Sequence, residues 1–419
     1  MWRLGDVQRD LRDEVRALAL GPIRPRVLEV DQSGEYPADL HDLLGRAALL
    51  DVAVPREYGG RGLDEVASCV AVEELAKISS SVALISCYVK LVNVPLLLVG
   101  TEEQRRRWLP PLAAGEIRAS YALTEPGVGS DPAALETVAE RHGDTWVLNG
   151  LKRFIGYAGM ADLYVVFART GDPGARGISA FLVPGDAAGI SAEPLPTMGT
   201  PGWPLGAPRF EDVEVPHENL LGEEGGGFYL AMRTFDRSRP GVAAQAIGVG
   251  QGAVDLALDY ALRRQTFGKP LIGHEGMQFK LAEMETEVAA ARALTYQSAA
   301  AIDHDDRELT KLAAMAKLAA SDAAMRVTTE AVQVLGGNGY LLEFPAERMM
   351  RDAKVLQIYE GANEIQRLVI ARQMLKQAEA RDPIWPESMP GAPGVATGES
   401  APTPAEQSDS TQEKAGAAA

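Results

Sequence analysis

The chain has 419 residues, of which 46% are hydrophobic and 24% are charged, a composition typical of a globular protein with a sizeable buried core. Its formal net charge of -17 argues against nucleic acid or an anionic membrane surface as the main partner. Only two cysteines occur, which excludes a disulfide framework, and the five scattered histidines predict no metal site. We expect a cytoplasmic protein, because the first residues lack a signal-peptide core and the longest apolar run is short for a membrane span.

Helical spacing dominates residues 6–120. Thr101 followed by Gln104 is typical of a capped helix start, and Pro110-Pro111 are expected to end that helix. We therefore predict an N-terminal helical domain over residues 1–120.

Residues 121–230 have a different character, with dense glycine and proline. Short apolar runs rich in β-branched and aromatic residues stand at 146–148, 163–168 and 178–183, and such runs favour strands. Because no helical segments separate them, we predict a middle domain built as an antiparallel β-barrel or sandwich.

Residues 231–380 return to an alanine-rich helical pattern, which predicts a C-terminal four-helix-bundle domain. The glycine run 248–252 lacks a preceding strand, so close helix packing explains it better than nucleotide binding. Residues 381–419 hold few large apolar side chains and are predicted to be a disordered tail. The predicted fold class is α+β multidomain.

Two stretches carry residues suited to catalysis. Residues 121–131 read Tyr-Ala-Leu-Thr-Glu-Pro-Gly-Val-Gly-Ser-Asp, and the glycines expose amides that can hold a phosphate or a heteroaromatic edge. A plain surface loop is the alternative. The other stretch places Glu360 beside Ile358 and Tyr359. A carboxylate in apolar surroundings has a raised pKa and can act as a base, although a capping or ion-paired glutamate is the alternative.

Taken together, these stretches resemble the acyl-CoA dehydrogenase family. Residues 124–131 match the family's first signature, and residues 333–366 contain its second. Residues 235–240 and 264–270 look like the landmarks between them. Several long motifs in this order are far more specific than a single glycine loop. The resemblance implies FAD-dependent dehydrogenation of an acyl-CoA thioester to the trans-2-enoyl thioester, in lipid metabolism.

The resemblance assigns Glu360 as the base that takes the α-proton while the flavin N5 accepts hydride from the β-carbon. Ser238 stands where one branch of the family carries its base, so Glu360 has no rival. The amide of Glu360 and a flavin ribityl hydroxyl would polarise the thioester carbonyl. The implied flavin-binding residues are Leu123, Thr124, Gly129, Ser130, Phe154, Ile155, Gly156, Arg264, Phe267, Gln333, Gly336 and Gly337. The implied substrate-binding residues are Ser130, Asp236, Arg239, Tyr359 and Gly361.

Arg264 is expected to pair with the flavin pyrophosphate of a neighbouring subunit. A site shared between chains implies an oligomer, in this family usually a homotetramer built as a dimer of dimers. The resemblance also implies an electron-transfer flavoprotein as the electron acceptor.

The chain departs from the family pattern close to the flavin. Phe154 and Gly156 stand where the family commonly has tryptophan and a hydroxyl residue, and Trp203 adds a bulky indole to a nearby segment. Lys90 is expected to be a surface lysine, with a contact to a polar acyl group as the alternative. Two further readings therefore stay open: the same chemistry on a carrier-protein-bound acyl group, and a flavin oxidase or oxygenase. A non-catalytic scaffold is the reading from another class.

Overall fold

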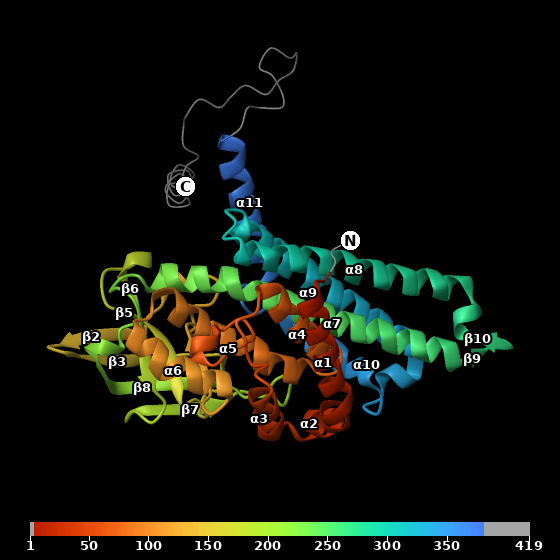
Figure 1. Cartoon of the computed structure of the whole chain (residues 1–419), viewed down its shortest axis with the longest axis horizontal. Helices are drawn as coiled ribbons and strands as arrows, with labels where there is room; N and C mark the ends of the chain where they lie inside the picture. Colours follow the sequence, from red (N-terminus) through yellow and green to blue (C-terminus); the bar gives the residue numbers. More distant parts are fainter. Residues whose placement is uncertain (1–3, 381–419) are drawn as a thin grey trace, which may run out of the picture. The chain divides into compact units, whose positions relative to one another are not determined.

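The structure is a computed structural model that describes residues 4–380. Residues 4–371 belong to one compact unit, and residues 372–380 belong to a second. The tail predicted over residues 381–419 lies outside the described residues. Helices come first along the chain, a sheet follows, and long helices return, as the sequence predicts (Figure 1).

Helices make up the N-terminal part. Their bounds are α1 Asp6–Leu18, α2 Val27–Ser33, α3 Ala38–Arg46, α4 Glu65–Ala76, α5 Ser80–Val99 and α6 Glu102–Ala114. The predicted cap of α6 is confirmed, because the Gln104 amide donates to Thr101 Oγ1 at 3.2 Å and the Thr101 amide donates to Gln104 Oε1 at 3.0 Å. The predicted break at Pro110-Pro111 is wrong, since both prolines lie within α6. Leu109 and Leu112 are fully buried on either side, and this packing outweighs the helix-breaking tendency of proline.

Two helices are longer and more apolar than the sequence analysis anticipated. By length and composition alone, α5 and α7 (Gly227–Arg263) could each cross a membrane. In both, 78% of the most apolar window is buried against the rest of the protein, which is the pattern of core helices.

The middle part is a sheet whose strands include the three predicted runs. Its strands are β1 Ala119–Ala122, β2 Val138–His142, β3 Thr145–Leu151, β4 Ile155–Gly156, β5 Leu163–Arg169, β6 Ile178–Pro184, β7 Ile190–Pro194 and β8 Leu205–Pro216. The order is β1-β5-β2-β3-β8-β4, with β6 beside β5 and β7 beside β8. The predicted antiparallel pairing holds for most neighbouring strands, but β5 runs parallel to both β1 and β2. The chain passes through β2–β4 before it returns beside β1, a crossover that strand spacing does not reveal.

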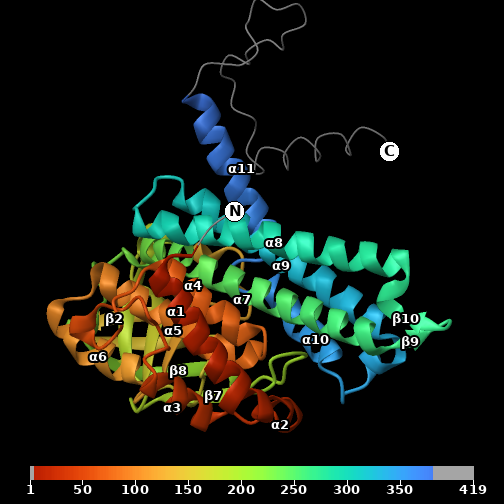
Figure 2. The ribbon, with the colours of Figure 1, turned by 45° about the vertical axis from the view of Figure 1, so that its right-hand side comes forward.

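Long helices form the C-terminal part. Besides α7, they are α8 Glu275–Asp303, α9 Leu309–Leu335, α10 Pro345–Leu356 and α11 Asn363–Glu379, with a short hairpin of β9 Gln265–Thr266 and β10 Lys269–Pro270. In both views α7, α8 and α9 run side by side (Figures 1 and 2). The packing interpretation of the glycine run is confirmed. A Cβ on Gly248 would lie 2.5 Å from the Glu73 carbonyl oxygen, and one on Gly252 would lie 2.3 Å from that of Lys77, so α7 approaches α4 through its glycines.

Candidate active site

Glu360 lies on a tight turn between α10 and α11. Its φ is +52° and that of Gly361 is +93°, so two consecutive residues are left-handed. For a residue other than glycine this conformation costs about 1 kcal/mol or more and persists only when surrounding contacts hold it. Those contacts are visible: Arg239 Nε donates to the Glu360 carbonyl oxygen at 3.2 Å, and Gln366 Nε2 donates to that of Gly361 at 2.7 Å.

The Glu360 carboxylate has the electrostatics of a general base. The residue keeps some exposed surface, but enough protein surrounds the carboxylate that burial raises its pKa to about 7. The hydroxyl of Ser238 donates to Oε2 at 2.5 Å, and this hydrogen bond lowers the pKa, as do the charges of Arg239, Lys317 and Lys90. The balance leaves the carboxylate able to accept and release a proton near neutral pH.

The backbone of Glu360 adds a hydrogen-bond donor beside the carboxylate. Among residues 4–380, its amide N–H makes no hydrogen bond to another protein group. An amide of this kind can bind a ligand oxygen, and here it would do so next to a proton acceptor.

The expected substrate-binding residues on α7 come together around Glu360 with those on the turn at residues 359–361, here called the base turn because the resemblance assigns Glu360 as the base. Arg239 pairs with Asp236 at 3.3 Å, and Asp236 accepts a hydrogen bond of 2.6 Å from Thr310. Tyr359 donates to Gln245 Oε1 at 2.5 Å, which fixes its ring beside α7. The first half of α7 therefore supports both the base turn and its neighbours.

A second group of expected residues forms an open surface at the sheet. The Arg153 amide donates to the Thr124 carbonyl oxygen at 2.9 Å, so the glycine loop and the segment around Phe154 lie side by side. Phe154 has a φ of +59° and is 57% exposed. A Cβ on Gly127 or Gly129 would meet nothing within 4 Å. An exposed aromatic ring beside open glycine backbone fits the edge of a planar heteroaromatic ligand such as a flavin.

Two of the departures from the family pattern, Gly156 and Trp203, pack together with Tyr88 of α5. A Cβ on Gly156 would lie 2.7 Å from Trp203 Cζ2 and 2.8 Å from Tyr88 Cζ, so these two rings occupy the space that a side chain at position 156 would need. Tyr88 Oη also accepts the Tyr121 amide at 3.1 Å, which links α5 to β1. The glycine and the two bulky residues are therefore sterically coupled.

Lys90 is not a surface lysine, contrary to expectation. It is 4% exposed, its ammonium group pairs with Glu65, and Asp51 lies 3.9 Å away. The helix around it is buried on nearly every side, so the side chain has no solvent to reach and needs a carboxylate partner instead. Its ion pair also argues against the alternative of a contact to a polar acyl group.

The remaining expected flavin residues lie at the other end of α7. Arg264 follows the last residue of α7, and Phe267 in the adjoining hairpin is 97% exposed. Gly336 and Gly337 are open, and the neighbouring Asn338 donates to Tyr260 Oη at 3.0 Å, which brings them to the same end. Arg239 and Arg263 stand 24 positions apart on α7, a distance of about 36 Å at a rise of 1.5 Å per residue. Within one chain, this group and Glu360 are separate.

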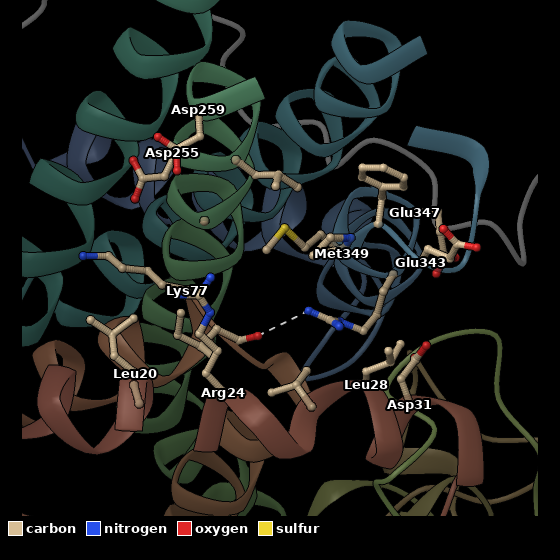
Figure 3. A pocket seen from close by; sticks show the side chains of 18 of the residues that line it. Leu20, Arg24, Leu28, Asp31, Lys77, Asp255, Asp259, Glu343, Glu347 and Met349 are labelled. Carbon is tan, nitrogen blue, oxygen red and sulfur yellow. Dashed lines mark hydrogen bonds between the residues drawn. The ribbon is translucent and has the colours of Figure 1, made fainter. Parts of the chain in front are cut away.

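A hollow of about 540 Å³ lies elsewhere, among α1, α2, α4, α7 and the start of α10 (Figure 3). Its lining mixes charges of both signs, such as Arg24 and Asp255, with apolar side chains such as Leu28 and Met349. None of the expected site residues lines it. Glu360 therefore does not border this hollow.

Models for three domains of one protein family match the chain in the same order as its helical, sheet and helical parts. Residues 5–116 match the acyl-CoA dehydrogenase N-terminal domain, residues 120–213 its middle domain and residues 225–375 its C-terminal domain. The chain belongs to the acyl-CoA dehydrogenase family. A probable acyl-CoA dehydrogenase, FadE25, of Mycobacterium tuberculosis is 42% identical over 378 residues, covering 90% of this chain and 97% of the relative.

Solved structures of acyl-CoA dehydrogenases and related enzymes share the fold. Butyryl-CoA dehydrogenase from Megasphaera elsdenii superposes with a TM-score of 0.87 at 41% identity, covering 90% of this chain and all of that one. The prolyl acyl carrier protein oxidase AnaB superposes with a TM-score of 0.83 at 30% identity, covering 89% of this chain and all of that one. The chain is thus an enzyme of the acyl-CoA dehydrogenase family.

Three contacts of the turn around Glu360 escaped the sequence analysis. From the sequence, Ser238 was notable only because some family members carry their base at this position, yet its hydroxyl donates a hydrogen bond to the Glu360 carboxylate. Gln366 was only the end of a motif, and Lys317 was not singled out. A signal for Lys317 exists, because it stands alone among alanines on the buried face of a predicted helix.

Proposed function

We propose that the chain binds FAD and oxidises a saturated acyl-CoA to the trans-2-enoyl-CoA, with Glu360 as the base. The observation that carries the proposal is the Glu360 carboxylate, whose pKa is raised to about 7, beside its own backbone amide, which makes no hydrogen bond within residues 4–380. A base with a pKa near the working pH is the most effective kind.

The residues of the chain divide the work around the acyl group. Glu360 takes the α-proton, and its amide N–H holds the thioester oxygen, which gains negative charge as that proton leaves. The Ser238 hydroxyl orients the carboxylate, and Arg239 holds the backbone of the base turn. The flavin, when bound, accepts the hydride from the β-carbon, so the acyl group loses one proton and one hydride in all.

Residues at the sheet would hold the reactive ring of the flavin. Thr124, Gly129 and Ser130 lie at least partly exposed in the glycine loop and would offer backbone and hydroxyl groups, and Phe154 offers an exposed aromatic face. The Leu123 side chain is buried, so this residue would contribute through its backbone. Ile155 and Gly156 lie buried next to it in β4.

A second copy of the chain would complete the site. Arg264 follows the end of α7, about 36 Å along that helix from Arg239, which is too far to join the base within one chain. Phe267 in the adjoining hairpin and Gln333, Gly336 and Gly337 at the end of α9 belong to the same end, where Asn338 binds Tyr260. A neighbouring subunit that presents this end would supply an arginine for the flavin pyrophosphate. Arg264→Ala is expected to lose bound flavin while the melting temperature of the apoprotein stays unchanged. Arg263→Ala, one residue earlier and also exposed, is the matched control.

The decisive experiment is an anaerobic titration with straight and branched acyl-CoAs, starting from butyryl-CoA, while the visible flavin band is followed. Bleaching by one acyl-CoA supports bound FAD and thioester dehydrogenation together. Glu360→Gln should bind flavin yet fail to bleach, because an amide cannot accept the proton. Glu364→Gln, an exposed glutamate four residues further along, should bleach as the wild type does. A protein that takes up no FAD would refute the proposal.

A second candidate is the same oxidation on an acyl group bound to a carrier protein. The likeness to a prolyl acyl carrier protein oxidase and the unusual packing of Gly156, Tyr88 and Trp203 favour it. Competition between free acyl-CoA and acyl-carrier substrates separates the two. Reoxidation by an electron-transfer flavoprotein or by oxygen, the latter with release of hydrogen peroxide, distinguishes a dehydrogenase from an oxidase.

A further inference from the structure

A buried lysine on α9 holds the turn that carries the base. Lys317 has no exposed surface, and its ammonium group donates to the Gly361 carbonyl oxygen at 2.9 Å and to Asn363 Oδ1 at 2.9 Å. Asn363 is itself fixed to α9, since its amide donates to Ser321 Oγ at 2.9 Å. Lys317 therefore anchors the turn to a long, rigid helix.

Burying a charged ammonium group at the position of Lys317 costs free energy, which its contacts to the base turn must offset. Its two hydrogen-bond acceptors at the turn are neutral oxygens rather than carboxylates. Ala313, Ala320 and Ala324 on the same buried face are apolar, so a methionine would fill the space without the free-energy penalty of burying an ammonium group. The contacts that distinguish lysine from methionine here are those to the base turn.

The charges of Lys317 and Glu360 also act on each other. Burial lowers the pKa of Lys317 to about 7, and the Glu360 charge is the largest influence opposing that fall. In return, the charge of Lys317 lowers the pKa of Glu360. Other charged groups that influence Lys317 are Arg239, Asp322 and Glu364. Groups on the surrounding elements that interact with Glu360 are Ser238, Arg239, Cys87, Tyr88, Lys90, Tyr121 and Tyr359.

We propose that Lys317 is a positioning residue for the base: by holding the Gly361 carbonyl, it fixes where the carboxylate and amide of Glu360 lie. This inference rests on the proposed function of Glu360. Gly361 needs such a donor, because a glycine with a φ of +93° has other conformations open to it once its carbonyl is released. Gln366 also donates to this carbonyl, so losing Lys317 loosens the turn without abolishing it.

Two substitutions separate the hydrogen bond of Lys317 from its charge. Lys317→Met keeps the bulk and removes both, so kcat should fall about 10- to 100-fold, as displaced catalytic groups do, with KM changing less than about threefold. The acidic limb of the kcat/KM profile should move to higher pH, because Glu360 loses a neighbouring positive charge. Lys317→Gln restores a neutral donor and should regain part of kcat while the limb stays shifted. Lys311→Met, at the more exposed start of the same helix, is the control.

The outcomes distinguish this inference from the function on which it rests. Wild type and Lys311→Met should be bleached by an acyl-CoA, and Glu360→Gln should not. If the wild type responds to no acyl-CoA, both proposals fall. If the wild type is active and a folded, flavin-loaded Lys317→Met keeps the wild-type kcat and acidic limb, only the Lys317 assignment falls. Loss of folding or of flavin in both Lys317 variants would overturn it as well, since the residue would then support the fold itself.

Discussion

The hydroxyl of Ser238 offers the sharpest test of how the base is tuned. Ser238→Ala removes the hydrogen bond of 2.5 Å to Glu360 Oε2, which lowers the pKa of that carboxyl group. A hydrogen bond to an ionised group is worth about 1.5–3 kcal/mol, or about one to two pKa units. We expect a shift of about one unit, at the low end, because Glu360 keeps some exposed surface.

The sign and size of the effect on catalysis follow from this shift. The base must be deprotonated to react, so the acidic limb of the kcat/KM profile should move about one unit to higher pH. Starting from a pKa of about 7, the rate at pH 6 should fall about tenfold, whereas at pH 9 it should change less than about twofold.

The assay is the initial rate of acyl-CoA oxidation with an artificial acceptor between pH 5.5 and 9.5. Ser238→Thr keeps a hydroxyl and should stay close to the wild-type profile. Ser298→Ala is a matched control, because Ser298 is buried and its hydroxyl has no hydrogen-bond partner in the described structure. A Ser238→Ala profile that superposes on the wild type would show that the hydroxyl does not tune the base.

Three other predictions concern stability. Gly156→Ala should lower the free energy of unfolding by about 1–3 kcal/mol in urea melts, because the new methyl group meets Trp203 and Tyr88, whereas Gly276→Ala in open space should not destabilise. Lys90→Met should cost about 3 kcal/mol of unfolding free energy by leaving the largely buried Glu65 carboxylate, whose side chain is 15% exposed, without its partner. Lys90→Met with Glu65→Leu should recover most of that loss, and equal melts for both variants would contradict this. Burial raises the pKa of Asp352 to about 6, so between pH 4 and 6 the folded protein keeps a proton that the unfolded chain has released, and this residue makes stability fall as pH rises. Asp352→Asn should flatten that part of the stability profile, and an unchanged slope would refute the assignment.

Much of the fold was predictable because its signals are local. The strand runs and the capped start of α6 are written in neighbouring residues, and the glycine run of α7 correctly predicted close helix packing. What failed depends on distant partners. The parallel β1–β5 pairing joins residues about 44 positions apart, and the prolines in α6 are tolerated because of tertiary packing.

The site divides in the same way. The motif identified Glu360, yet its pKa and hydrogen bonds come from α7 and α9, which lie far away in sequence. Lys90 was misjudged because the sequence does not show that Glu65, 25 residues earlier, lies beside it. A motif can thus name a reactive side chain, but the groups that tune it depend on how the helices pack.

The length of α7 has a genetic consequence. The first half of this helix holds the chain's own Glu360, and under the proposed assembly its far end serves the flavin of a neighbour. Two different inactive variants should therefore complement each other. In mixed oligomers of Glu360→Gln and Arg264→Ala, some sites would combine an intact Glu360 from one chain with an intact Arg264 from the other. Co-expression should restore measurable activity, whereas each variant alone stays inactive; a protein whose sites are complete within one chain would show no such recovery.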